Sequence, residues 1–162
     1  MPTTFHGLPL HPLLIHVVVI LLPLSAAMII ASAVWPAARR RLGIGTPGIA
    51  AIVLVFVPIT THAGNWLKSR LPANPAIQKH AHLGNQVIWY AIGMFLVATA
   101  VWGLGRVLDA RATTPMGALA IWKSPVTIAI AVVAIGLSAA SLVQIYRVGD
   151  SGAKTIWQGV GQ

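Results

Sequence analysis

Four long runs of apolar residues, separated by short polar segments, dominate the pattern of the chain. The runs cover residues of about 12–35, 48–67, 75–104 and 125–146. Each run is long enough for an α-helix to cross the hydrocarbon core of a bilayer, which takes about 20 residues. The pattern therefore predicts an all-α integral membrane protein, a four-transmembrane-helix up-down bundle that forms one domain over residues 1–162.

Prolines and tryptophans support these boundaries. Pro12, Pro75 and Pro125 suit a first helical turn, where the missing N–H costs nothing, and Pro36 closes the first run. The first run lacks a basic segment before it and exceeds the apolar length of a signal peptide, so we expect a retained helix. Four tryptophans lie at or just beyond the ends of the runs, as in an interfacial aromatic belt: Trp35, Trp66, Trp122 and Trp157.

Composition strengthens this prediction and removes several classes of function. Of the 162 residues, 57% are hydrophobic and only 8% are charged, whereas about 25% of an ordinary soluble domain is charged. The absence of cysteine excludes disulfides, thiolate metal sites and cysteine nucleophiles. Asp109 and Asp150 are the only acidic residues, which argues against catalysis by a pair of carboxylates. The sequence therefore identifies no catalytic residue.

The positive charge of the chain indicates lipid contact and an orientation. The 11 Lys and Arg residues lie in short segments between apolar runs, which suits anionic headgroups of the lipid bilayer and not nucleic acid. Four crossings place both termini on one side of the membrane. Because the N-terminal tail has no Lys or Arg and the first loop contains Arg39, Arg40 and Arg41, we expect extracytoplasmic termini.

The histidines gather at one end of the predicted bundle. They lie near the start of the first helix, the end of the second and the start of the third, and these three ends meet on one face of the membrane. Asp150 follows the fourth helix on the same face. Polar groups within a membrane usually face the bundle interior, so this end is predicted to form a polar pocket. The histidines are His6, His11, His16, His62, His80 and His82.

Helical geometry divides the histidines of the third run. At 100° per residue, His80 shares a face with Gly84 and Ala91, and small residues of this kind allow neighbouring helices to approach. We therefore expect His80 to point into the bundle. His82 lies about 160° away around the helix, on the side of Trp89.

His16 and His11, near the N-terminus, are expected to lie in different places. His16 shares its face with Ile20 and Pro23, which we interpret as an inward face. His11 precedes Pro12 and is expected to be a cap or loop residue over the mouth of the pocket. At the other end of the chain, the Gly149–Gly152 segment has the composition of a turn.

Four motifs occur in order along nearly the whole chain. They resemble a bacterial membrane family, common in actinobacteria, that is catalogued as domain of unknown function 2231. The motifs are GLPLHPLLIH over Gly7–His16, GNWL over Gly64–Leu67, HAHLG over His80–Gly84 and RVGDSGAK over Arg147–Lys154.

This resemblance implies a four-helix domain in the bacterial plasma membrane, in a family without a settled activity. Relatives sometimes carry Rieske or cytochrome c domains on the same chain, which implies membrane electron transfer. The recurring histidines of the family match His11, His16 and His80. Asp150 stands where some relatives have histidine, and His62 lies outside the family pattern.

The leading hypothesis is a redox module that binds haem b near the extracytoplasmic face. Haem iron accepts axial histidines, and helix bundles build cofactor sites from facing helices. His16 and His80 would be the axial pair, with His62 as the substitute. The module would pass electrons to or from quinol or a membrane redox partner protein.

Two alternatives stay open. In the first, His11, His16, His80 and Asp150 bind Zn or Cu without haem. In the second, the protein is an accessory or scaffold protein without a cofactor, whose histidines respond to protons near neutral pH. The faces rich in small residues are also compatible with a homodimer.

Overall fold

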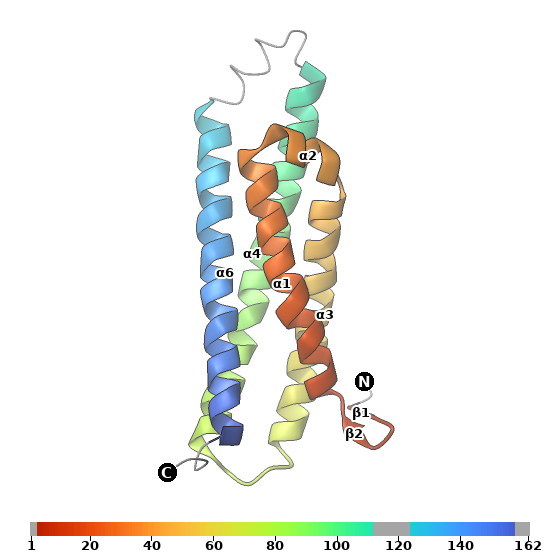
Figure 1. The fold of residues 1–162 in the computed structure, drawn as a ribbon, viewed down its shortest axis with the longest axis vertical. Helices are drawn as coiled ribbons and strands as arrows, with labels where there is room; N and C mark the ends of the chain where they lie inside the picture. Colours follow the sequence, from red (N-terminus) through yellow and green to blue (C-terminus); the bar gives the residue numbers. More distant parts are fainter. Residues whose placement is uncertain (1–2, 112–123, 158–162) are drawn as a thin grey trace.

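The computed structural model describes residues 3–111 and 124–157. Within these residues, four helices are long and apolar enough to cross a membrane, which confirms the all-α membrane bundle (Figure 1). The elements in chain order are strands β1 (Thr4–Phe5) and β2 (Leu8–Pro9), then helices α1 (His11–Val34), α2 (Pro36–Leu42), α3 (Gly45–Lys68), α4 (Pro75–Arg111) and α6 (Pro125–Trp157).

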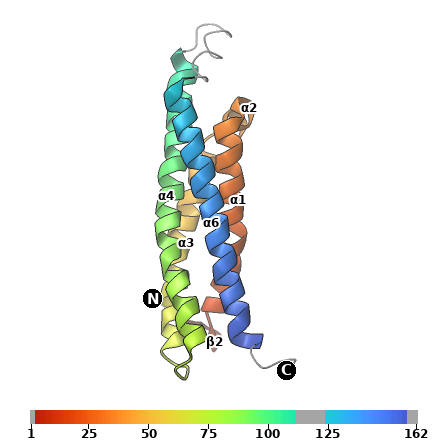
Figure 2. The same cartoon turned by 90° about the vertical axis from the view of Figure 1, so that its left-hand side faces the viewer.

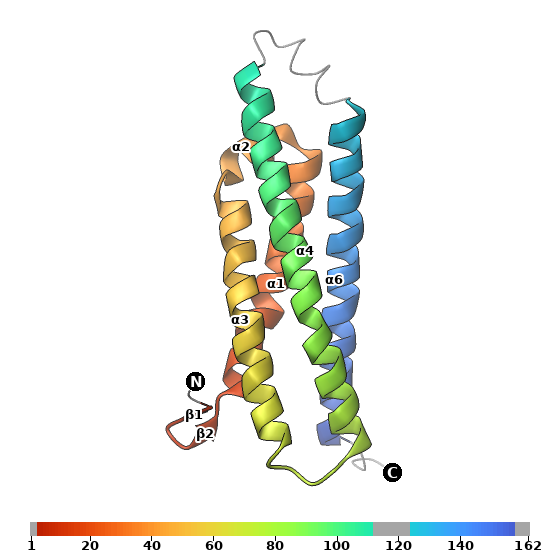
Figure 3. The same cartoon turned by 180° about the vertical axis from the view of Figure 1, so that it is seen from behind.

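The long helices run alternately up and down. Helix α1 packs against α3 and α6, α4 packs against the same two helices from the other side, and a smaller contact joins α1 to α4 (Figures 2 and 3). The N-terminal hairpin and the end of α6 lie at one end of the bundle, and α2 lies at the other. The described chain therefore begins and ends on the same side, as four crossings require. The side of the membrane on which they lie stays a prediction.

The first connection differs from the predicted loop. Pro36 disfavours helical backbone in the residue before it, and Trp35 is extended, with φ −127° and ψ 106°. A new helix, α2, begins at Pro36 and ends where Gly43 takes a positive φ of 49°. The three arginines predicted in a loop are therefore helical. Proline in the first turn and glycine just after the last turn are ordinary start and stop signals of a helix, and Pro36 and Gly43 take these two positions.

Two helices are longer than predicted. Helix α4 continues past Leu104 to Arg111, and α6 continues past Tyr146 to Trp157. The Gly149–Gly152 segment is helical, so its prediction as a turn was wrong. Asp150 and Lys154 form an i,i+4 ion pair of 2.7 Å along this last stretch, which supports helix over turn.

A hairpin that the sequence analysis did not predict precedes α1. Strands β1 and β2 pair antiparallel, with Phe5 opposite Leu8. His6 and Gly7 form the two-residue turn, and both have positive φ, 47° and 79°. The Leu10 N–H donates to the Thr3 carbonyl at 3.0 Å and closes the hairpin beside the start of α1.

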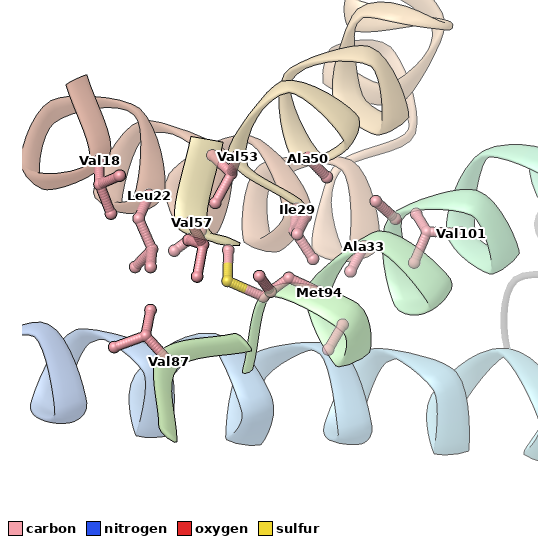
Figure 4. Close-up of a cluster of buried hydrophobic side chains, with 14 of the residues drawn as sticks. Val18, Leu22, Ile29, Ala33, Ala50, Val53, Val57, Val87, Met94 and Val101 are labelled. Carbon is pink, nitrogen blue, oxygen red and sulfur yellow. The ribbon is translucent and has the colours of Figure 1, made fainter. Parts of the chain in front are cut away.

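The core of the bundle is narrow and built from small and medium side chains (Figure 4). Ala26, Ala91, Ala98 and Ala134 are wholly buried and let the helices approach closely. Larger side chains fill the space between them: Leu22, Ile29, Val53, Val57 and Met94. Only 22–33% of the most apolar stretch of each long helix is buried inside the bundle, so the remaining apolar surface is left for lipid.

Because the core is narrow, its buried alanines leave no room for a larger side chain. We expect Ala98→Leu to destabilise the protein by about 1–3 kcal/mol, because the larger side chain overpacks the core. Ala100→Leu, on the exposed side of the same helix, is the matched control and should leave stability nearly unchanged. Unfolding of both variants in mild detergent measures the difference. Equal stability of the two variants would contradict the packing described here.

Candidate functional site

A small cavity of about 40 Å³ lies near the end of the bundle that carries the N-terminal hairpin. All four long helices contribute to its wall. His11 and His80 are its two ionisable groups, Thr60 and Thr61 add hydroxyls, and the other lining side chains are apolar. A pocket is therefore present at the predicted end, but its lining is mostly apolar, so the prediction of a polar pocket holds only for the two histidines and the two threonines.

His11 is the first residue of α1, and it points into the bundle. Its Nδ1 lies 3.0 Å from the carbonyl oxygen of Thr60 on α3. A carbonyl only accepts hydrogen bonds, so Nδ1 carries the proton and donates it to this bond. The expected cap or loop residue is thus part of the cavity wall and joins α1 to α3.

His80 makes the equivalent bond on the other side of the cavity. Its Nδ1 lies 3.1 Å from the carbonyl oxygen of Val148 and 3.1 Å from the hydroxyl oxygen of Ser151, both on α6. The Ser151 hydroxyl itself donates to the Val148 carbonyl at 2.8 Å. Since both partners have oxygen lone pairs facing the ring, Nδ1 again carries the proton. The prediction that His80 points inward is confirmed.

The two rings face a common space. Their centroids are 6.1 Å apart and their planes meet at 74°. With both Nδ1 atoms protonated, each neutral ring keeps the lone pair of Nε2. Among residues 3–111 and 124–157, no side chain or main-chain group hydrogen-bonds to Nε2 of His11 or His80. The arrangement offers two nitrogen lone pairs for a proton, a hydrogen-bond donor or a metal ion.

Each ring packs against a glycine of a neighbouring helix. A Cβ at Gly64 would lie 2.8 Å from Nδ1 of His11, and a Cβ at Gly152 would lie 3.0 Å from Cε1 of His80. Real Cβ atoms essentially never approach as closely as at Gly64, and the contact at Gly152 is tight enough that the His80 ring would have to shift by a few tenths of an ångström. Both glycines are in the motifs noted in the sequence, but their role as cradles for the histidines was not foreseen.

His16 does not join the site. Its side chain is exposed on the outside of α1, with Nδ1 2.7 Å from the Pro12 carbonyl, and Ile20 on the same face is 64% exposed. The predicted inward face of α1 is therefore wrong. Helix α1 is apolar on every side, so periodicity gave no contrast by which to choose the buried face.

The remaining candidate residues also lie apart from the pair. His62 is exposed on α3, and the exposed Asp150 pairs with Lys154. His82 is exposed and accepts a hydrogen bond from Gln86 at 3.1 Å, as its predicted outward side implies. In the described part of the chain, no three metal-binding side chains come together, so the set of His11, His16, His80 and Asp150 is not assembled.

A buried amide joins α6 to α4 one turn after His80. Gln144 on α6 is nearly inaccessible, and its Nε2 donates to the carbonyl of Leu83 at 2.9 Å and to Oε1 of Gln86 at 3.4 Å. Asn65 of α3 donates to Asn85 of α4 at 3.0 Å. These bonds hold α4 against its neighbours on the turn that follows His80.

Comparison with known families gives one match. A family model described as "Predicted membrane protein (DUF2231)" matches residues 7–161, a span that contains both cavity histidines and both cradle glycines. No match to the chain was found among the curated proteins or among the solved structures.

The close contacts of Gly64 with His11 and of Gly152 with His80 lead to a prediction. Gly64→Ala should displace His11 and break its bond to Thr60, and Gly152→Ala should displace His80 from Val148. A helix normally gains up to about 1 kcal/mol from this substitution, but overpacking costs about 1–3 kcal/mol, so both variants should lose stability. Nitrogen NMR of the histidine rings should also show loss of the fixed Nδ1–H form.

Matched controls exist on the same two helices. A Cβ at Gly48 of α3 or at Gly149 of α6 would meet no atom within 4 Å. Gly48→Ala and Gly149→Ala should therefore keep the ring signals of the wild type and equal or exceed its stability. Unchanged histidine signals in Gly64→Ala and Gly152→Ala would refute the cradle.

Proposed function

The chain belongs to the membrane-protein family catalogued as domain of unknown function 2231, and we propose that it binds one transition-metal ion through Nε2 of His11 and His80. The observation that carries this proposal is the shared arrangement of the rings. Each donates its Nδ1–H to a main-chain carbonyl of a neighbouring helix and keeps its Nε2 lone pair. Histidines that bind metals typically have this second hydrogen bond, which holds the tautomer and the ring orientation.

The separation of the rings is compatible with one shared ion. A histidine nitrogen binds such an ion at about 2.0 Å, with the ring centre about 1.2 Å further back, so two rings on one ion have centres up to about 6.4 Å apart. The observed 6.1 Å is within this limit. A cavity of about 40 Å³ also has room for an ion, since one water needs about 10–15 Å³ by the same measure.

The number of donors favours Cu⁺ over Zn²⁺. Zinc is normally held by three or four protein ligands, and in the described residues only two histidines meet. The closed-shell Cu⁺ ion is stable with two imidazole ligands, and imidazole suits copper. Two ligands also leave the ion open to exchange with a third from a partner, so a copper carrier of the membrane fits better than a structural metal site.

The described residues do not fit haem b. The axial pair expected from the sequence included His16, which faces outward. For His11 and His80, the cavity of about 40 Å³ is far below the roughly 300–1,000 Å³ of sites for larger organic ligands. Electron exchange with quinol or a redox partner protein was predicted from the family resemblance and from the haem hypothesis, and it is not part of the proposal made here.

Metal binding can be measured directly. We expect the purified, detergent-solubilised protein to bind one Cu⁺ per chain under reducing, anaerobic conditions, measured by competition with a coloured Cu⁺ chelator. His11→Ala or His80→Ala should each lower the affinity by at least 100-fold, because a single imidazole remains. Ser151→Ala removes only one of two acceptors of His80 and should cost about 10-fold.

Exposed histidines provide the controls. His16→Ala and His82→Ala should keep the wild-type affinity, and thermal unfolding should confirm that every variant is folded. If His11→Ala and His80→Ala bind Cu⁺ as tightly as the wild type, the proposal is wrong. A Soret band with sharp reduced bands in the visible spectrum would restore the haem hypothesis, and stoichiometric zinc would replace copper.

A further inference from the structure

The end of the bundle opposite the cavity is closed by the short helix α2, which carries three consecutive arginines (Figure 1). Their environments differ. Arg39 is buried, whereas Arg40 and Arg41 are exposed. This difference separates an arginine that anchors the helix from two that face outward.

Arg39 anchors α2 to α4. The side chain of Arg39 is only 6% exposed, and its guanidinium donates from Nη2 to Asp109 at 3.2 Å. The side chain lies directly over Gly105, where no Cβ would fit. Burial lowers the pKa of Arg39, and the negative charge of Asp109 opposes this shift. The anchor sets the rotation of α2, and successive residues on a helix point about 100° apart.

Arg40 and Arg41 have no carboxylate side chain to pair with. The whole chain contains two acidic residues against 11 Lys and Arg. Asp109 pairs with Arg39, and Asp150 pairs with Lys154 at the other end of the bundle. Among the described residues, no carboxylate side chain is left for Arg40 and Arg41, so their charge is available to a group outside the chain.

The residues that flank α2 indicate the environment of the group that balances Arg40 and Arg41. Trp35 before the helix is 60% exposed, and Ile44 just after it is 69% exposed. Tryptophan is enriched where membrane meets water. One exposed apolar residue thus lies on each side of the exposed arginines. This arrangement suits the boundary between acyl chains and headgroups, and it would be unfavourable on a surface that faces only water or nucleic acid.

We propose that α2 is a binding site for anionic phospholipids, with the guanidinium groups of Arg40 and Arg41 on headgroup phosphates and with Trp35 and Ile44 in the acyl-chain boundary. Guanidinium matches phosphate oxygens in a two-pronged hydrogen bond, which ammonium cannot form. This inference is independent of metal binding, because the two sites lie at opposite ends of the bundle.

The test uses the full chain in nanodiscs of phosphatidylcholine with graded phosphatidylglycerol. Native mass spectrometry measures how strongly phosphatidylglycerol is retained over phosphatidylcholine. Arg40→Gln with Arg41→Gln should lower this preference by about 10- to 30-fold, since each cation near an anionic surface contributes about 5-fold. Arg40→Lys with Arg41→Lys should retain only part of it.

A charge-matched variant decides whether the effect belongs to α2. Lys79→Gln with Arg147→Gln removes two exposed cations from the opposite end and should keep the preference. An equal loss in both double variants would mean general charge attraction and would overturn the proposal, as would no loss in the α2 variant. Thermal unfolding checks that the variants remain folded, which is expected because Arg39 and its anchor are unchanged.

Discussion

Hydrocarbon offers no hydrogen-bond partners, and this constraint organises the whole molecule. Every main-chain group at membrane depth must bond within the protein, which favours uninterrupted helices. Polar side chains must find partners inside the bundle, as Gln144 does at the Leu83 carbonyl. Large apolar side chains are free to face outward, as Leu96 and Val132 do. The interior is left to small residues and to a few polar groups, among which the small hydroxyls of Ser25 and Ser138 have no hydrogen-bond partner in the described chain.

The same constraint explains the form of the histidine pair. Two imidazole rings at the end of a narrow bundle are fixed in orientation by hydrogen bonds from Nδ1 to the carbonyls of Thr60 and Val148. Those bonds join α1 to α3 and α4 to α6, so the pair also ties the four long helices together at this end. Gly64 and Gly152 provide the space that the rings need. The same two side chains therefore join the helices through Nδ1 and, in the function that we propose, would bind the ion through Nε2.

The pairing of charges depends in the same way on which groups are buried. With two carboxylates for 11 cations, the chain neutralises only Arg39 and Lys154 internally. Asp109 is used on a buried arginine, where an unpaired charge would be costly. Among the described residues, lipid phosphates and water can balance the exposed cations, which are Arg40, Arg41, Arg70, Lys79, Arg106 and Arg147.

Hydropathy alone determined the membrane class, the four spans, the up-down order and the gathering of histidines at one end, because span length and the number of crossings follow directly from the sequence. It also predicted that His80 faces inward and His82 outward, since small residues mark one side of α4. The tertiary structure decided the rest. It turned His16 outward, because α1 is apolar all round and only its neighbours select the buried face. It also continued α6 as a helix through Gly149 and Gly152, because tertiary packing of Gly152 against the His80 ring outweighs the local tendency to turn. His11 and His80, which are far apart in the sequence, thereby line the same cavity.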